Sequence, residues 1–149
     1  KNVNELKDGA MVGIPNDPTN GGRGLLLLQR AGLLKLKDGV GMKATPKDVV
    51  DNPKHLKFKE LEAAQLPRSL ADVDAAAITM NYVMSGGLDV KKQNIFLEPK
   101  DEPLAVMIIA ARNKDKDKEA YKAFVKAYQS EAVKKFIADK YKGTIEPAF

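Results

Sequence analysis

A short polar segment, Asn20-Gly21-Gly22-Arg23, has the residue types of a site that binds an anion. The guanidinium of Arg23 is a planar fork of N–H donors that can hold a carboxylate through two parallel hydrogen bonds. A glycine-rich turn that enters a helix also leaves backbone N–H groups unpaired at the positive end of the helix dipole, where a carboxylate can bind. All four residues are therefore candidate binding residues for a carboxylate.

The same segment has a plainer interpretation, which the residues alone favour. The two glycines can serve only to form a turn, and Arg23 can make an ordinary surface ion pair. A nucleotide site is poorly supported, because Gly21-Gly22 lacks both the Gly-x-Gly-x-x-Gly spacing of dinucleotide-binding proteins and the Gly-Lys-Ser/Thr of phosphate loops.

Side chains suited to catalysis are scarce in this sequence. His55 is the only histidine and cysteine is absent, so an imidazole or thiolate metal site has little support. Ser69 and Ser85 have no histidine at a spacing that suits a Ser-His-acid triad. Asp72 and Asp74 are typical of turns and helix ends. We therefore expect a protein that is not an enzyme, with no catalytic residue, metal or cofactor.

The composition indicates a soluble globular chain. Its 149 residues carry a formal net charge of +5, which would suit an anionic partner such as nucleic acid. Lysines alternate with acids, as over residues 114–118, and this pattern is typical of a solvated surface; we expect no nucleic-acid partner. The longest apolar run, residues 25–28, is far below the roughly 18 residues of a membrane span.

Alternating strand and helix patterns surround the polar segment. A loop is expected over residues 15–22. Buried or alternating strands are predicted at residues 10–14, 56–61, 73–79, 95–97 and 105–111. Helices or helical turns are predicted at residues 3–8, 24–31, 46–51, 63–70, 81–85, 118–128 and 133–141. This alternation predicts a single α/β domain over residues 1–149.

Longer stretches of the chain carry a specific family resemblance. The first is Ile14-Pro15-Asn16-Asp17-Pro18-Thr19-Asn20-Gly21-Gly22-Arg23, followed by a leucine-rich helix. Further matching words lie at residues 44–53, 60–70, 72–74, 81–82 and 140–143. Together these words resemble the NLPA lipoprotein family, which includes methionine-binding proteins, and they span nearly the whole chain.

The resemblance implies a lobe of the type II periplasmic-binding-protein fold, a three-layer α/β sandwich with a mostly parallel sheet and C-terminal helices. Family members have two lobes, are held outside the cytoplasmic membrane by an upstream lipidated N-terminus, and deliver methionine or related compounds to an ABC permease. Residues 10–105 would form the second lobe. Residues 106–149 would form the crossing strand and the helices that pack on the first lobe, most of which precedes this segment in the family.

The resemblance also assigns ligand-binding residues. Arg23 matches the family arginine that binds the substrate carboxylate, and Asn20, Gly21 and Gly22 match the loop around it. Thr79 stands where the family usually has an asparagine shortly before the matching Asn81, and both are candidate ligand-binding residues. Leu104 and Val106 replace a tyrosine and an asparagine of the family pattern.

These substitutions bear on affinity. A polar ligand group left unpaired in a closed site costs roughly 1 to 3 kcal/mol. The leading prediction is therefore an isolated lobe of a binding protein for methionine or a related amino acid or peptide, with impaired ligand binding.

A second interpretation is a stand-alone or engineered α/β scaffold with no small-molecule role. Both C-terminal helices carry large apolar side chains at helical spacing: Tyr121, Phe124, Val125, Tyr128, Phe136 and Ile137. We expect this segment to pack back on its own lobe or on a second copy, as a homodimer, because each buried large side chain contributes roughly 1.5 to 3 kcal/mol.

Overall fold

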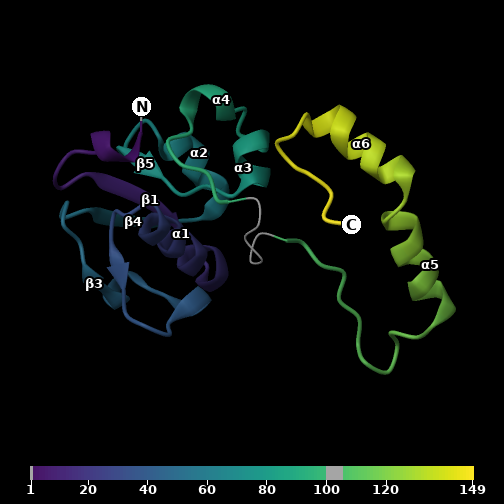
Figure 1. The fold of residues 1–149 in the computed structure, drawn as a ribbon. Coiled ribbons are helices and arrows are strands. Elements are labelled where there is room, and N and C mark those ends of the chain that lie inside the picture. Colours follow the sequence, from purple (N-terminus) through teal and green to yellow (C-terminus); the bar gives the residue numbers. More distant parts are fainter. Residues whose placement is uncertain (1, 100–105) are drawn as a thin grey trace. The chain divides into compact units, whose positions relative to one another are not determined.

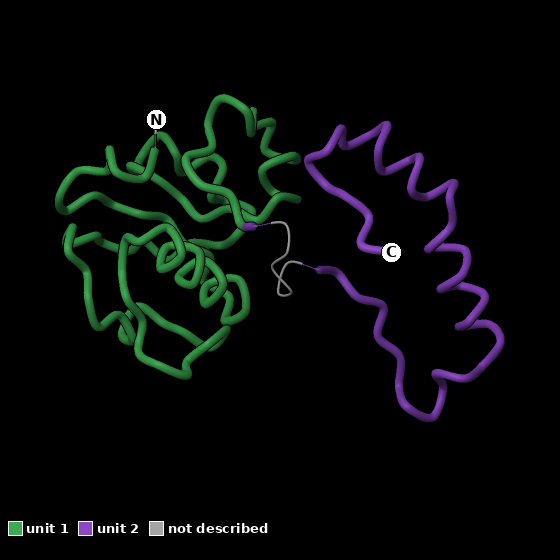
Figure 2. The backbone as a smooth tube through the Cα atoms, in the orientation of Figure 1, with its two compact units in different colours: residues 1–98 green, residues 99–149 purple. Residues whose placement is uncertain are grey.

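The structure is a computed structural model that describes residues 2–99 and 106–149. The chain divides into two compact units, shown in Figure 2: unit 1 is Lys1–Glu98 and unit 2 is Pro99–Phe149. Among the described residues, no helix combines the length and the apolar character needed to cross a membrane.

Unit 1 is built around the parallel strand β1 (Met11–Pro15). Strand β4 (Lys57–Leu61) pairs with one edge of β1 and strand β5 (Ala75–Ala76) with the other, both in parallel register. Four of the five β1 residues are buried. A short apolar run of this kind is typical of a central parallel strand that is covered on both faces.

Helices α1 (Pro18–Arg30) and α2 (Leu66–Ser69) cover opposite faces of this sheet (Figure 1). Val12 and Ile14 belong to the same buried cluster as Leu25 of α1. Gly13 faces the other way, because a Cβ added there would lie 3.0 Å from the Leu66 side chain of α2. The helix-sheet-helix layering confirms the predicted α/β sandwich with a mostly parallel sheet.

The shorter elements of unit 1 connect these layers. They are the 3₁₀ turns η1 (Val3–Glu5), η2 (Gly41–Lys43), η3 (Pro46–Asp48) and η4 (Ala63–Gln65), strands β2 (Lys35–Leu36) and β3 (Val49–Asp51), and helices α3 (Met80–Ser85) and α4 (Val90–Gln93). Strands β2 and β3 form a separate antiparallel pair.

Two local predictions from the sequence were wrong in this unit. The expected loop over residues 15–22 is helical from Pro18 onward, because Asp17 caps the helix and proline suits its first position. The expected helix after Thr45 is only the turn η3, held by a capping box between Thr45 and Asp48. The two valines that follow belong to β3 instead of continuing the helix, and Val49 pairs with Leu36 of β2.

Three predicted strands are shortened or absent among the described residues. The strand expected at residues 73–79 is reduced to β5, and residues 95–97 form no strand. Residues 106–111 also lack regular structure, while Ala105 and Leu104 lie outside the described residues. Met107 is 93% exposed and Ile108 is 79% exposed. An apolar run needs a hydrogen-bonding strand beside it, and the described residues of unit 2 offer none.

Unit 2 contains the two predicted C-terminal helices, α5 (Glu119–Tyr128) and α6 (Glu131–Tyr141). The preceding segment was expected to be fully solvated, but Asp115 is buried, with 3% of its surface exposed. Its carboxylate accepts from Arg112 Nε at 2.6 Å and pairs with Lys118 Nζ at 2.7 Å. Two cations thus enclose one acid, and this explains its burial in a charged sequence.

Candidate functional site

The site is organised by the start of helix α1, directly after the carboxyl end of β1. The Asp17 side chain accepts a hydrogen bond from the backbone N–H of Asn20 at 2.9 Å, and the Asn20 amide donates to both Asp17 oxygens at 3.1 Å. The backbone N–H of Asn20 is the main cause of a lowered pKa for the Asp17 carboxyl. The helix amino terminus therefore already holds an anion that the chain itself supplies.

Gly21 and Gly22 have a packing role in this helix. Both are buried, and neither lines the pocket described below. A Cβ at Gly21 would lie 2.7 Å from the Pro15 carbonyl oxygen, and one at Gly22 would lie 2.1 Å from the Met42 carbonyl oxygen. The glycines thus let α1 lie directly against neighbouring backbone. The sequence had suggested that they form a turn before the helix, and this prediction was wrong.

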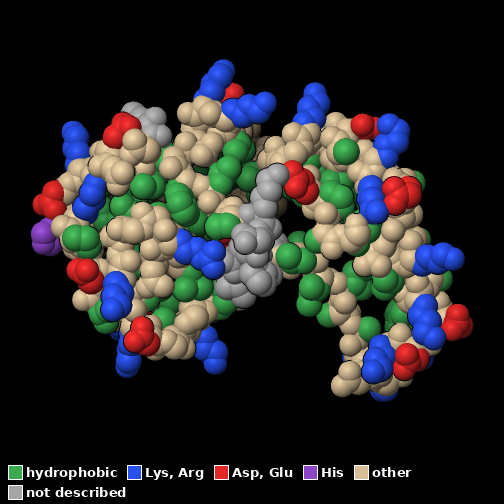
Figure 3. Space-filling model, viewed as in Figure 1, with side chains coloured by type: hydrophobic (Ala, Val, Ile, Leu, Met, Phe, Trp, Pro, Cys, Tyr) green, Lys and Arg blue, Asp and Glu red, His purple; other side chains and the backbone are tan. Residues whose placement is uncertain are grey.

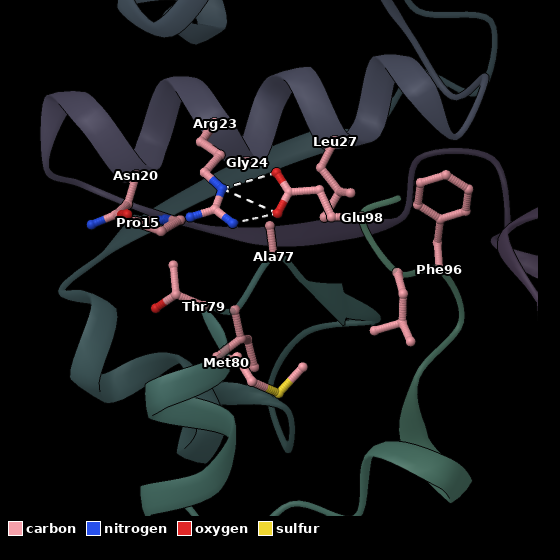
Figure 4. A pocket seen from close by; sticks show the side chains of 12 residues that line it. Pro15, Asn20, Arg23, Gly24, Leu27, Ala77, Thr79, Met80, Phe96 and Glu98 are labelled. Atoms are coloured by element: carbon pink, nitrogen blue, oxygen red, sulfur yellow. Dashed lines mark hydrogen bonds and ion pairs between the residues drawn. The ribbon is translucent and has the colours of Figure 1, made fainter. Parts of the chain in front are cut away.

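A pocket of about 120 Å³ lies beside α1 in unit 1 (Figure 4). Three segments supply its lining: the end of β1 together with α1, the residues from β5 to the start of α3, and the last residues of the unit. The lining residues are Pro15, Asn20, Arg23, Gly24, Leu27, Ala77, Ile78, Thr79, Met80, Phe96, Leu97 and Glu98. Most of them are apolar, and Arg23 and Glu98 are the charged ones.

Arg23 and Glu98 form a two-pronged ion pair inside this pocket. Arg23 Nε donates to Glu98 Oε1 at 2.9 Å and to Oε2 at 3.2 Å, and Arg23 Nη2 donates to Oε2. Figure 4 shows the two side chains pointing toward each other above Ala77. Both are partly shielded from water, with 26% and 21% of their side-chain surfaces exposed. The guanidinium is therefore placed to hold a carboxylate in a partly apolar setting.

The structure brings some of the predicted site residues together and leaves others apart. Asn20, Arg23 and Thr79 share the pocket. Gly21 and Gly22 lie in the same helix without lining the pocket, and Asn81 is exposed on α3, also outside the lining.

Sequence reasoning missed several lining residues, of which Glu98 is chemically the most important. Glu98 lies 75 positions from Arg23, so no local spacing connects the two residues. The only local signal is an acidic residue at the end of the apolar run 95–97, just before Pro99.

Other chemically able side chains lie outside the pocket. His55 Nδ1 is 2.7 Å from Asp8 Oδ1, and the His55 side chain is 78% exposed. Among the residues that the structure describes, no group of three His, Asp or Glu side chains could hold a metal ion. The pocket thus combines a guanidinium, a group that suits a carboxylate, with a mostly apolar lining.

The chain is similar to several known binding lipoproteins. The family model described as "NlpA lipoprotein" matches residues 1–149. The D-methionine-binding lipoprotein MetQ of Salmonella typhimurium is 55% identical over 135 residues, which cover 89% of this chain and 49% of that protein. The chain thus spans about half the length of the curated relatives it matches. These names describe binding lipoproteins, in agreement with the expectation that the chain is not an enzyme.

Solved structures of methionine-binding proteins are also similar to this chain. A crystal structure of the methionine-binding protein MetQ is 49% identical with a TM-score of 0.85. The match covers 99% of this chain and 61% of the MetQ chain. A nutrient-binding protein from Burkholderia cenocepacia bound to methionine is 44% identical with a TM-score of 0.86. The match covers 99% of this chain and 62% of that protein's chain. The fold of this chain is therefore that of the matching part of these binding proteins.

Proposed function

The chain belongs to the NlpA lipoprotein family, and on that premise we propose that it is part of an ABC-importer binding protein for methionine or a related amino acid or peptide. In this proposal Arg23 holds the ligand carboxylate. Asn20 and Thr79 offer polar groups beside it, and the apolar pocket wall receives the ligand side chain. The relatives named as methionine-binding proteins make a thioether ligand the first choice.

One observation carries this proposal: the Arg23 guanidinium already grips a carboxylate, that of Glu98, with the two-pronged geometry that a ligand carboxylate would need. A planar guanidinium in this orientation is pre-organised, so little side-chain entropy is lost on binding. Leu27 and Phe96 line the same pocket and can contact an aliphatic chain. The pair of features suits an amphipathic amino acid better than a phosphate or a sugar.

We further propose that unit 1 provides only one wall of the complete site, and that this chain alone binds its ligand weakly. The pocket of about 120 Å³ is small beside the roughly 300 to 1,000 Å³ of typical small-molecule sites. Thr79 and Val106 replace family asparagines, which removes amide groups from the ligand's surroundings. Gly21, Gly22 and Asn81 would act indirectly, through the packing of α1 and the position of α3.

For unit 2 we propose a packing role. Figure 3 shows apolar side chains over much of the visible face of this unit, with many of its lysines and acids toward one edge. Tyr121, Phe124, Tyr128 and Phe136 are each more than 40% exposed. In the full-length protein this face would pack against the part that this chain does not span, with residues 10–105 as the second lobe. The whole protein would be lipid-anchored outside the cytoplasmic membrane and would deliver its ligand to an ABC permease.

A titration of the isolated chain tests the proposed function. L- and D-methionine are added to millimolar concentrations while amide NMR shifts are recorded. We expect saturable shifts at Asn20, Arg23 and Thr79, which are lost in Arg23→Gln and kept in Arg30→Gln, a matched change at the other end of α1. Shifts that persist in Arg23→Gln would contradict the proposal.

The exposed apolar face favours one second candidate, a homodimer with no small-molecule role. Exposed patches of this kind promote self-association. Sedimentation velocity over a range of protein concentrations separates the two candidates. A dimer that Phe124→Lys dissociates, together with no response to methionine, would favour the scaffold; a monomer that responds to methionine would exclude it.

A further inference from the structure

We propose that Glu98 is a built-in competitor of the ligand: its carboxylate occupies Arg23 in the empty site and must be displaced or neutralised before an external carboxylate binds. The inference deepens the proposed function and rests on it for the identity of the ligand. It assigns the role of affinity-setting residue to a side chain outside the six predicted site residues.

The geometry of the empty pocket is the first step. Glu98 takes up the edge of the guanidinium formed by Nε and Nη2, with both of its oxygens engaged. This edge is one of the two at which a carboxylate can form parallel hydrogen bonds with arginine. A ligand carboxylate that approaches the same edge therefore needs Glu98 to leave.

Charge is the second step, and it applies to either edge of the guanidinium. One cation cannot neutralise two carboxylates, and like charges a few ångströms apart disfavour each other's ionised state. Leu27, Ala77 and Phe96 line the same pocket and reduce screening by water. Glu98 therefore opposes an anionic ligand even where the two do not share the same N–H groups.

A positioning role for Glu98 would give the opposite result. If Glu98 served only to hold Arg23 in place, removing its charge would loosen Arg23 and weaken binding. Glu98→Gln separates the two roles well, because the amide has the shape of the carboxylate and keeps one oxygen that can accept from Arg23. Glu98→Ala removes the charge and the acceptor together.

The test uses acetate as a probe that carries the carboxylate and almost nothing else. The Nε–H resonance of Arg23 and the amides of α1 are followed during titration of the full chain with sodium acetate, against sodium chloride at equal ionic strength. We expect acetate to bind Glu98→Gln on the order of tenfold more tightly than the unaltered chain. Glu98→Ala should also bind acetate more tightly. Glu62→Gln is the same change at an exposed site outside the pocket, and it should leave the affinity for acetate unchanged.

Each outcome bears on one proposal or the other. Equal or weaker acetate binding by Glu98→Gln, or loss of the folded spectrum in both Glu98 variants, would overturn the competitor role. A gain that persists in the double variant Arg23→Gln/Glu98→Gln would also overturn it. Methionine is then titrated into Glu98→Gln. If the variant binds acetate more tightly than the unaltered chain does, but binds methionine no better than acetate, the competitor role stands and the methionine proposal fails. If methionine shifts the resonances of the pocket residues but the affinity for acetate does not rise, the methionine proposal stands and the competitor role fails.

Discussion

Replacing Gly22 by alanine should destabilise unit 1, and the structure gives the size of the effect. The added Cβ would lie 2.1 Å from the Met42 carbonyl oxygen and 2.6 Å from its carbon, well below the 3.0 Å that real Cβ atoms respect. The neighbour is backbone and cannot rotate away, so α1 or η2 must shift. Overpacking of this kind costs roughly 1 to 3 kcal/mol or more. Alanine has a higher helix propensity than glycine, and this difference stabilises the variant by about 1 kcal/mol.

Because the contact is with backbone, we expect Gly22→Ala to lie at the upper end of this overpacking range, with a net loss of up to about 2 kcal/mol, a large part of the stability of a small domain. Gly24→Ala is the matched control on the same helix. Its Cβ would lie 3.2 Å from the Ala77 side chain, which needs only a small adjustment. We expect that variant to stay within about 1 kcal/mol of the original chain, because propensity and crowding nearly cancel.

Urea unfolding measures both variants, with amide NMR signals of buried α1 residues such as Leu25 reporting on unit 1 alone. Arg23 follows Gly22 directly, so a shifted helix should also weaken the acetate response at Arg23. If Gly22→Ala proved as stable as the original chain, or if Gly24→Ala were the more damaging of the two, the close approach of α1 to η2 would be refuted.

Two further predictions concern acidic residues that precede helices. Asp17→Ala should cost about 1 kcal/mol through loss of the α1 cap. Because folding lowers the pKa of Asp17, its stabilisation is present above pH 3.8, the ordinary value, and is lost as pH falls through the lowered folded value. Urea unfolding should thus show the two chains converging in acid, and a constant difference would contradict this. In unit 2, Asp115→Ala leaves Arg112 and Lys118 without their shared acceptor and should cost about 1 to 2 kcal/mol. Faster hydrogen exchange at the Tyr121 amide would report it, and unchanged exchange would count against it.

The strand-helix unit around the site could be predicted because its signals are local. Alternation, apolar runs and capping residues place β1, β4, α5 and α6 within a few residues of their observed bounds. The start of α1 was missed because glycine and proline count against a helix in local propensity. Packing decides otherwise: Gly21 and Gly22 are needed where α1 touches backbone, and that contact is not visible in sequence.

The candidate site was predicted only in part for a related reason. Arg23 could be recognised by its chemistry and by its family motif. Its partner Glu98 could not, because the pair is formed by tertiary folding across 75 residues. Residues 95–97 and 106–111, the described parts of two predicted strands, form no strand for a similar reason. An apolar run indicates that a segment is to be buried, but a strand also needs a neighbour to receive its hydrogen bonds.

Binding of a methionine-like ligand through its carboxylate at Arg23 can be tested with two ligands that differ only in that group. L-methionine and L-methioninol differ in the carboxylate, which the alcohol lacks. The Arg23 Nε–H resonance of the unaltered chain is followed while each compound is added. We predict a saturable shift with methionine at concentrations on the order of tenfold lower than any effect of methioninol, since a bidentate ion pair is lost. Equal affinities, or binding of methionine that leaves the Arg23 resonance unmoved, would show that Arg23 does not hold the ligand carboxylate.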